Sequence, residues 1–285
     1  MNSYNSWHLR KKQTCLFLKF FLIVYCSFTL VEVNGQLVKN KDSSEGKELY
    51  PKVIKKKLFS IYTAIGLAQK AKINSESSDH RVISTPQPAG EIGFNLQCDL
   101  NNNLFFITGL TLTITGRNAV LDVPVHQINP SYPDPYPLTE ISDADFCATI
   151  PFEIEKDWQL GKSKIIYGRI GLNLRYSFGY DEDFYDYYLT DTNNQNINVF
   201  SLELNSNNHN KPWFTYIIGG GYGWTLRNHN LIKLGLVANI SLTKFVSGTY
   251  EVNIPGDPLT HGSYGVTGSY IGLSFNYVFV RFQKL

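Results

Sequence analysis

Most of the chain alternates between apolar and polar positions with a period of two. The segment 269–279 shows this most clearly, because its odd-numbered positions from 271 onward carry Ile, Leu, Phe, Tyr and Phe, whereas Gly272, Ser274 and Asn276 occupy the opposite face. An extended strand places alternate side chains on opposite faces. One apolar face and one small, polar face are typical of a strand in a membrane-embedded barrel. For this strand taken alone, a soluble β-sandwich is the alternative.

Seven further segments show the same alternation. We therefore predict eight strands: 58–68, 91–100, 104–115, 146–156, 166–180, 213–227, 231–243 and 269–279. Several reach the roughly 9–11 residues that a tilted strand needs to cross a bilayer. Short turns follow the second, fourth and sixth strands, and long polar or proline-rich segments follow the first, third, fifth and seventh.

This alternation of connection lengths predicts an all-β fold, a single eight-stranded antiparallel up-and-down transmembrane barrel with short periplasmic turns and long external loops. The segment 196–204 also looks extended, but its apolar residues fall on both faces. We place it as a hairpin arm inside the loop between the fifth and sixth strands. A ten-stranded barrel is the alternative.

Composition supports strands and excludes other classes. The chain contains 18 Tyr and 18 Phe without a helical apolar period, and its mean hydropathy of −0.18 excludes a bundle of membrane helices but not a barrel. The net charge of +2 is small and the basic residues gather mostly before Lys72, so we expect no nucleic-acid partner.

The N-terminus reads as an export signal. Basic residues at positions 10–12 and 19 flank an apolar run from Phe20 to Val31, and Val33-Asn34-Gly35 precedes a candidate cleavage site. We predict a signal peptide at 1–35 that is cleaved before Gln36, a polar and basic periplasmic leader at 36–57, and the outer-membrane barrel at 58–285. An uncleaved signal anchor is the alternative.

The polar faces of the predicted strands carry charges. An eight-stranded barrel has an interior just wide enough for side chains, so we predict a luminal polar network that plugs the barrel, with a conducting pore as the alternative. Its residues are Glu91, Asp99, Glu153, Glu155, Arg169, Asn173, Arg175 and Lys233.

Pairing of the fourth and fifth strands brings Glu153 within diagonal reach of Arg169, which predicts an ion pair. Cys98 is expected to face lipid near the periplasmic end, whereas Cys147 is expected to face inward near the outer rim, so these two cysteines should not form a disulfide.

One predicted external loop concentrates carboxylates and aromatic rings. This candidate patch comprises Asp181, Glu182, Asp183, Tyr185, Asp186, Tyr187 and Tyr188. We interpret it as a solvated loop whose aromatic residues lie at the membrane rim; a cation site or an adhesive patch is the alternative. We expect no enzyme activity, cofactor or metal site, since no nucleophile elbow or metal-spaced histidine cluster occurs. A rim site built from His126, Asp134 and a loop serine is the alternative.

Three motifs make the chain similar to the outer-membrane beta-barrel family often labelled PorT-like, found in Gram-negative bacteria. They are Ala64-Ile65-Gly66-Leu67, Ala148-Thr149-Ile150-Pro151-Phe152 and the segment Gly268 to Phe279. The resemblance spans about residues 58–282 and brings no common catalytic motif. It implies a non-enzymatic outer-membrane protein that contacts lipid and the barrel-assembly machinery. We expect a structural or surface-interaction scaffold, closed to large solutes and binding through its external loops. A component of a protein secretion or transport system, with secretion-system partners, is one alternative, and a soluble exported ligand-binding barrel is another.

Overall fold

The computed structural model describes residues 58–76, 82–122, 125–132, 139–177, 182–207, 211–226 and 229–280. The chain divides into two units, Met1–Lys47 and Glu48–Leu285, and every described residue belongs to the second. The predicted signal peptide and leader lie outside the described residues. So do Asp134 of the alternative rim site and Asp181 of the candidate patch.

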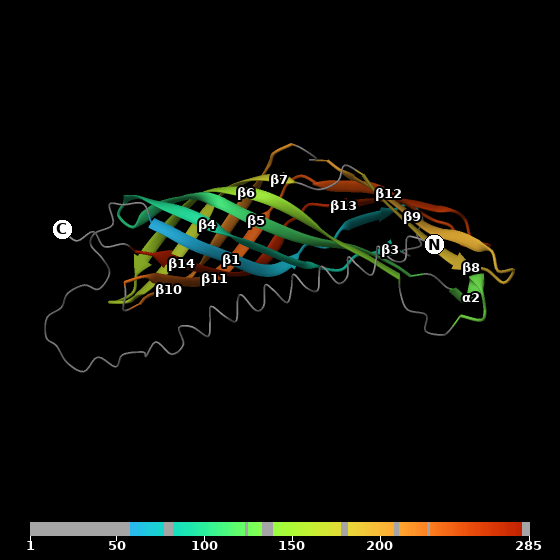
Figure 1. Cartoon of the computed structure of the whole chain (residues 1–285), viewed down its shortest axis with the longest axis horizontal. Coiled ribbons are helices and arrows are strands. Elements are labelled where there is room, and N and C mark those ends of the chain that lie inside the picture. The colour runs from blue at the N-terminus through green and yellow to red at the C-terminus, as the bar shows by residue number, and fades with distance from the viewer. Residues whose placement is uncertain are drawn as a thin grey trace. The chain divides into compact units, whose positions relative to one another are not determined.

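Eight antiparallel strands close into a barrel (Figure 1). Neighbouring strands pair in the order β1-β4-β5-β6-β7-β10-β11-β14, and β14 pairs back with β1. The strands are β1 (Leu58–Ala68), β4 (Pro88–Asn101), β5 (Leu104–Leu121), β6 (Thr139–Gln159), β7 (Lys164–Ser177), β10 (Trp213–Thr225), β11 (Leu231–Ile240) and β14 (Tyr270–Phe279). The predicted eight-stranded antiparallel barrel is confirmed. The segment 196–204, which the ten-stranded alternative would place in the barrel wall, is not part of the barrel.

The alternation of the sequence maps onto the two faces of the barrel wall. Large apolar side chains cover the outside, as with Ile170, Leu236 and Ile271, which are 61%, 64% and 67% exposed. Polar and charged side chains are buried inside. This arrangement suits a wall between lipid and a polar interior. It is the reverse of a soluble ligand-binding barrel, whose apolar faces would line a cavity, so that alternative is inconsistent with the structure.

Short turns close one end of the barrel. Asn101, Asn102 and Asn103 between β4 and β5 all have positive φ, as does His229 between β10 and β11. Asparagine tolerates the left-handed region better than most residues, which explains a tight connection at this triplet. On the outer surface of β6, the exposed large apolar residues run from Phe146 to Trp158, so Phe146 marks the limit of the apolar band toward the opposite end.

Segments predicted as external loops instead form a second, five-stranded sheet. Its order is β2-β13-β12-β9-β8, with β2 (Lys72–Ser75), β13 (Thr260–Val266), β12 (Val246–Val252), β9 (Asn196–Ser206) and β8 (Glu182–Thr190). The predicted hairpin arm at 196–204 corresponds to β9, which pairs antiparallel with β8. We call this group of strands the outer sheet.

Two barrel strands continue past the apolar band to support the outer sheet. β5 runs on to Leu121 and β6 begins at Thr139, whereas the sequence placed these strand ends at Thr115 and Phe146. The short strand β3 (Val82–Ile83) pairs with β5 here, and the single helical turn α2 (Val125–Ile128) follows β5. His126, expected in a loop, lies in α2.

One apolar core joins these extensions to the outer sheet. It includes Ala119, Leu121, Val199, Phe200, Leu202, Phe245, Tyr250 and Tyr264. The outer sheet is therefore packed against the extended barrel wall and is not a set of separate loops. In the part of the chain that the structure describes, no helix is long and apolar enough to span a membrane.

Candidate functional site

The barrel interior contains three groups of ion-paired side chains. The first joins β4 to β7, where Arg175 Nη2 lies 3.1 Å from Glu91 Oε1 and both side chains are buried. Glu91 Oε1 also lies 3.3 Å from the donating Thr113 hydroxyl, and Arg175 Nη1 donates to the Gly268 carbonyl at 3.3 Å. This group crosses the lumen and ties four strands or strand ends together.

The second group contains the ion pair predicted from sequence. Arg169 Nη1 lies 3.5 Å from Glu153 Oε2, and both side chains are buried. In the β6–β7 register Arg169 faces Glu155, so its contact with Glu153 is diagonal, as predicted. Arg169 Nη2 also donates to the Tyr62 hydroxyl at 2.6 Å, and the guanidinium carbon lies 4.6 Å from the centroid of the Tyr62 ring.

The third group surrounds Lys233 on β11. Its ammonium is 2.5 Å from Glu155 Oε1 and 2.8 Å from each oxygen of Asp157. The centroids of the Phe105 and Tyr167 rings lie 5.6 and 5.3 Å from Nζ. Lys233 itself is 0% exposed. Asp157 was missed because the predicted fourth strand ended at Lys156, although the inward alternation of Glu153 and Glu155 continues to it.

The remaining two members of the predicted network, Asn173 and Asp99, differ in burial. Asn173 is buried in the interior on β7. Asp99 is not part of the network: it is only half-buried at the end of β4, where its Oδ1 accepts a hydrogen bond from the backbone N–H of Asn101 at 2.8 Å. Asp99 comes two positions before the turn at Asn101–Asn103, at the mouth of the barrel, where its carboxylate can remain in water.

Taken together, these groups fill the lumen with paired charges. Each of the three buried cations contacts at least one carboxylate within 4 Å. Buried charges of one sign cost several kcal/mol unless they are paired, which explains why opposite charges alternate across this narrow interior. Such a network holds opposing walls together and leaves the interior occupied by side chains.

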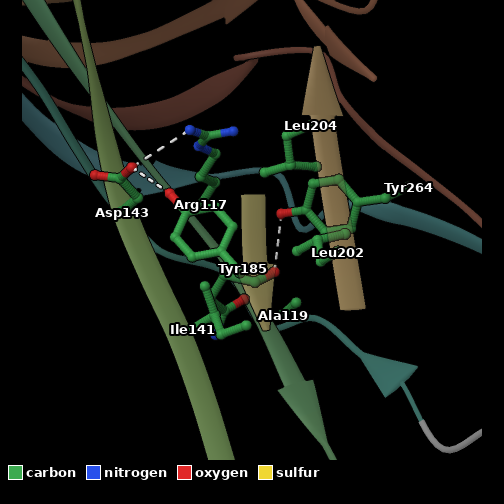
Figure 2. A pocket seen from close by; sticks show the side chains of 9 residues that line it. Arg117, Ala119, Ile141, Asp143, Tyr185, Leu202, Leu204 and Tyr264 are labelled. Atoms are coloured by element: carbon green, nitrogen blue, oxygen red, sulfur yellow. Dashed lines mark hydrogen bonds and ion pairs between the residues drawn. The ribbon is translucent and has the colours of Figure 1, made fainter. Parts of the chain in front are cut away.

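A second polar cluster lies between the outer sheet and the extended barrel wall, and we call it the outer clasp. Arg117 of β5 contacts three carboxylates: Asp143 at 3.4 Å, Asp145 at 3.1 Å and Asp183 of β8 at 2.9 Å. Figure 2 shows dashed lines from Asp143 to both Arg117 and Tyr185; the Tyr185 hydroxyl donates to Asp143 at 2.9 Å. The clasp therefore links the outer sheet to the barrel through charge-assisted hydrogen bonds.

The clasp lies beyond the apolar band and is largely buried. Burial raises the pKa of Asp145 to about 6, although the nearby Arg117 opposes this rise. Burial and the adjacent Asp143 also raise the pKa of the Tyr185 phenol. The clasp borders a small cavity of about 10 Å³, which has room for about one water molecule. A second link is made by Tyr264 of β13, whose hydroxyl donates to the Asn118 carbonyl at 2.9 Å (Figure 2).

The sequence did not indicate this cluster. Arg117, Asp143 and Asp145 all fell in the predicted loop between the third and fourth strands. Their pairing depends on the β5–β6 register beyond the membrane, where Arg117 lies opposite Asp143.

The six described residues of the candidate loop patch lie on strand β8, and they divide between its two faces. Asp183, Tyr185 and Tyr187 point inward, Asp183 to the clasp and the two tyrosines against the apolar core. Glu182, Asp186 and Tyr188 are exposed. The interpretation as a solvated loop at the membrane rim is wrong, because alternate residues anchor this segment in a sheet.

Chemically reactive groups are sparse. Among the described residues no group of three or more His, Cys, Asp or Glu side chains has the geometry to hold a metal ion. Cys98 and Cys147 are both free thiols, Cys147 buried and Cys98 partly exposed, as their predicted positions require. His261 lies 3.7 Å from Glu251 on the exposed side of the outer sheet.

No protein-family model and no curated protein matches this chain. Among solved structures, the outer membrane protein OprG from Pseudomonas aeruginosa is similar with a TM-score of 0.39 and 12% identity, covering 80% of this chain and 98% of that one. The N-terminal beta-barrel domain of Pseudomonas aeruginosa OprF gives a TM-score of 0.29 and 9% identity, covering 78% and 97%. An outer membrane channel from Pseudomonas putida F1 gives 0.25 and 10%, covering 83% and 99%.

Proposed function

We propose that this protein is a non-enzymatic integral outer-membrane barrel that is closed to large solutes and holds the outer sheet outside the membrane as an interaction scaffold. The observation that carries the proposal is the pairing of an apolar exterior with an interior filled by ion pairs around Arg169, Arg175 and Lys233. An apolar belt needs lipid, and a filled lumen is suited to support rather than to passage.

The orientation follows from strand number. A barrel with an even number of strands has both chain ends on one side, which is the periplasmic side in outer-membrane barrels. The short turns at Asn101–Asn103 and His229 then face the periplasm, and the outer sheet and clasp face the exterior. The export signal predicted at 1–35 supports the same location.

Two measurements test this proposal. Membrane fractionation should recover the full chain in the outer membrane as a heat-modifiable band on gels. Liposomes containing the purified protein should swell no faster in isotonic arabinose than empty liposomes, whereas liposomes with a general porin swell rapidly. Recovery in the soluble fraction contradicts the membrane assignment, and arabinose-driven swelling contradicts the closed barrel.

A second function, a part in an outer-membrane secretion or transport system, is favoured by the PorT-like motifs of the sequence. An external sheet held rigidly on a closed barrel is suited to contact other envelope proteins. Purification from outer membranes in mild detergent, with co-purifying proteins identified by mass spectrometry, separates this function from that of an autonomous scaffold.

A further inference from the structure

β8 is the last strand of the outer sheet and, among the described strands, pairs only with β9. Thr190 shows where its other edge points. The Thr190 N–H donates to the Tyr132 hydroxyl at 2.9 Å, and its carbonyl accepts from Tyr132 and from Asn129 Nδ2. Both backbone groups of Thr190 are therefore directed away from β9, and a neighbouring segment already uses them.

The rest of the strand directs its backbone groups in the same way. The irregularity in the β8–β9 pairing falls on β9, where Val199 is the extra residue, so alternation along β8 is uninterrupted. Because alternate residues direct their backbone groups to the same edge, the four even-numbered residues from Glu182 to Tyr188 share the direction of Thr190. Among the described strands, none pairs with them on that edge.

The side chains of these four residues are also exposed. Glu182 and Asp186 are carboxylates on the surface, and Phe184 and Tyr188 are 65% and 54% exposed. The strand contains neither proline nor lysine, the residues with which proteins commonly block an open edge. Its inward residues hold it in place through the clasp and the apolar core, so the edge is pre-ordered.

We propose that this edge binds an extended segment of a partner protein as an added strand, with basic and apolar side chains alternating on its exposed face. The proposal rests on the scaffold function above and names the class of partner. Main-chain hydrogen bonds to the open edge supply affinity, and alternate side chains supply specificity. Basic residues would lie across from Glu182 and Asp186, and apolar residues across from Phe184 and Tyr188, the pairs that stabilise neighbouring strands.

Charge and length argue against a second copy of this chain as the occupant. A second β8 would bring its own Glu182 and Asp186 to a face that already carries two carboxylates. The other free edge of the outer sheet, β2, has only four residues, so it can cover less than half of β8. A basic extended segment neutralises the edge and can match its whole length.

The test uses the full chain in detergent micelles and a fluorescein-labelled nine-residue peptide that carries lysine and valine in turn at every second position, with threonine between them, so that both fall on one face of the added strand. Fluorescence anisotropy should show saturable binding. A peptide of the same sequence with N-methyl groups on alternate residues keeps every charge and side chain but cannot donate along one edge, and it should bind about tenfold more weakly or less. Equal binding of the two peptides overturns the proposal, because it would show attraction by charge alone.

Matched variants locate the site. Phe184→Pro removes an N–H from the open edge without removing a bond to β9, so it should weaken binding more than Phe184→Ala does. Asp186→Lys should weaken binding about tenfold, whereas Glu251→Lys, the same charge change on the exposed face two strands away, should not. Equal losses for the last two variants overturn the proposal. Heat-modifiable migration confirms that each variant is folded.

Two further outcomes are separable. A dimer that forms without peptide and is abolished by Phe184→Pro, measured by sedimentation in detergent, would assign the edge to a second copy and overturn the proposal. The protein could also fractionate with the outer membrane and cause no liposome swelling, yet bind no peptide. That result would refute the edge site alone and leave the scaffold function intact.

Discussion

Replacement of Lys233 by methionine tests the luminal network most directly. Methionine has a similar length and can keep the contacts with Phe105 and Tyr167, so the change removes the charge with little loss of packing. Lys233 has no exposure to water, and its ammonium contacts Glu155 and both oxygens of Asp157. Removal of one partner from a buried ion pair typically costs about 3–5 kcal/mol, since the other charge is left uncompensated.

That cost corresponds to a fall of between about 10² and 10⁴ in the ratio of folded to unfolded protein, at about 1.36 kcal/mol per tenfold. Urea unfolding of the barrel in lipid vesicles, followed by tryptophan fluorescence, measures it. Lys164→Met, at an exposed strand end, is the matched control and should leave the midpoint unchanged.

The triple variant Lys233→Met, Glu155→Gln, Asp157→Asn should recover about 2 kcal/mol or more, because it removes the stranded charges together with their partner. A single variant that costs less than about 1 kcal/mol, or a triple variant no more stable than the single one, would refute the reasoning that paired charges hold this lumen together.

Three further predictions concern the clasp, the barrel seam and the thiols. Folding raises the pKa of Asp145 from 3.8 to about 6, so between these pH values the folded state retains a proton that the unfolded state loses. The free energy of unfolding should therefore fall by on the order of 2 kcal/mol as pH rises from about 4 to 6. Asp145→Asn should remove this pH dependence in urea titrations. A Cβ on Gly66 would overlap the backbone of Ile271 in the neighbouring strand, whereas one on Gly161 would meet open space, so Gly66→Val should reduce the heat-modifiable folded band and Gly161→Val should not. Cys98 should react with a maleimide in detergent, while Cys147 should react only after unfolding, as mass spectrometry of the labelled protein would show.

The sequence predicts the barrel well because lipid outside and polar side chains inside impose a period of two on each wall strand. The period of two is lost where a strand no longer separates lipid from the polar interior. Residues 116–121 of β5 are buried on both faces, so they show no alternation and read as a loop. Asp183 of β8 breaks the expected apolar inward face because Arg117 pairs with it.

The two candidate sites also differ in how far the sequence can predict them. The ion pair between Glu153 and Arg169 is predictable because it depends only on the register of two consecutive strands. The clasp depends on the placement of β8 against β5, segments that are 66 residues apart at Arg117 and Asp183. Such a contact follows from packing of the whole outer region and leaves no short-range pattern in the sequence.

The extension of β6 also determines how far the outer sheet stands from the bilayer. The strand segment from Thr139 to Asp145 lies beyond the apolar band that begins at Phe146. At about 3.3 Å per residue, reduced by a tilt of about 40°, it rises about 18 Å above that band. Because the clasp and the shared core fix β8 to this extension of β6, the open edge of β8 is held at a constant distance from the bilayer and at a constant angle to it. An added strand would meet an edge that is already ordered, so this protein would lose little conformational freedom on binding.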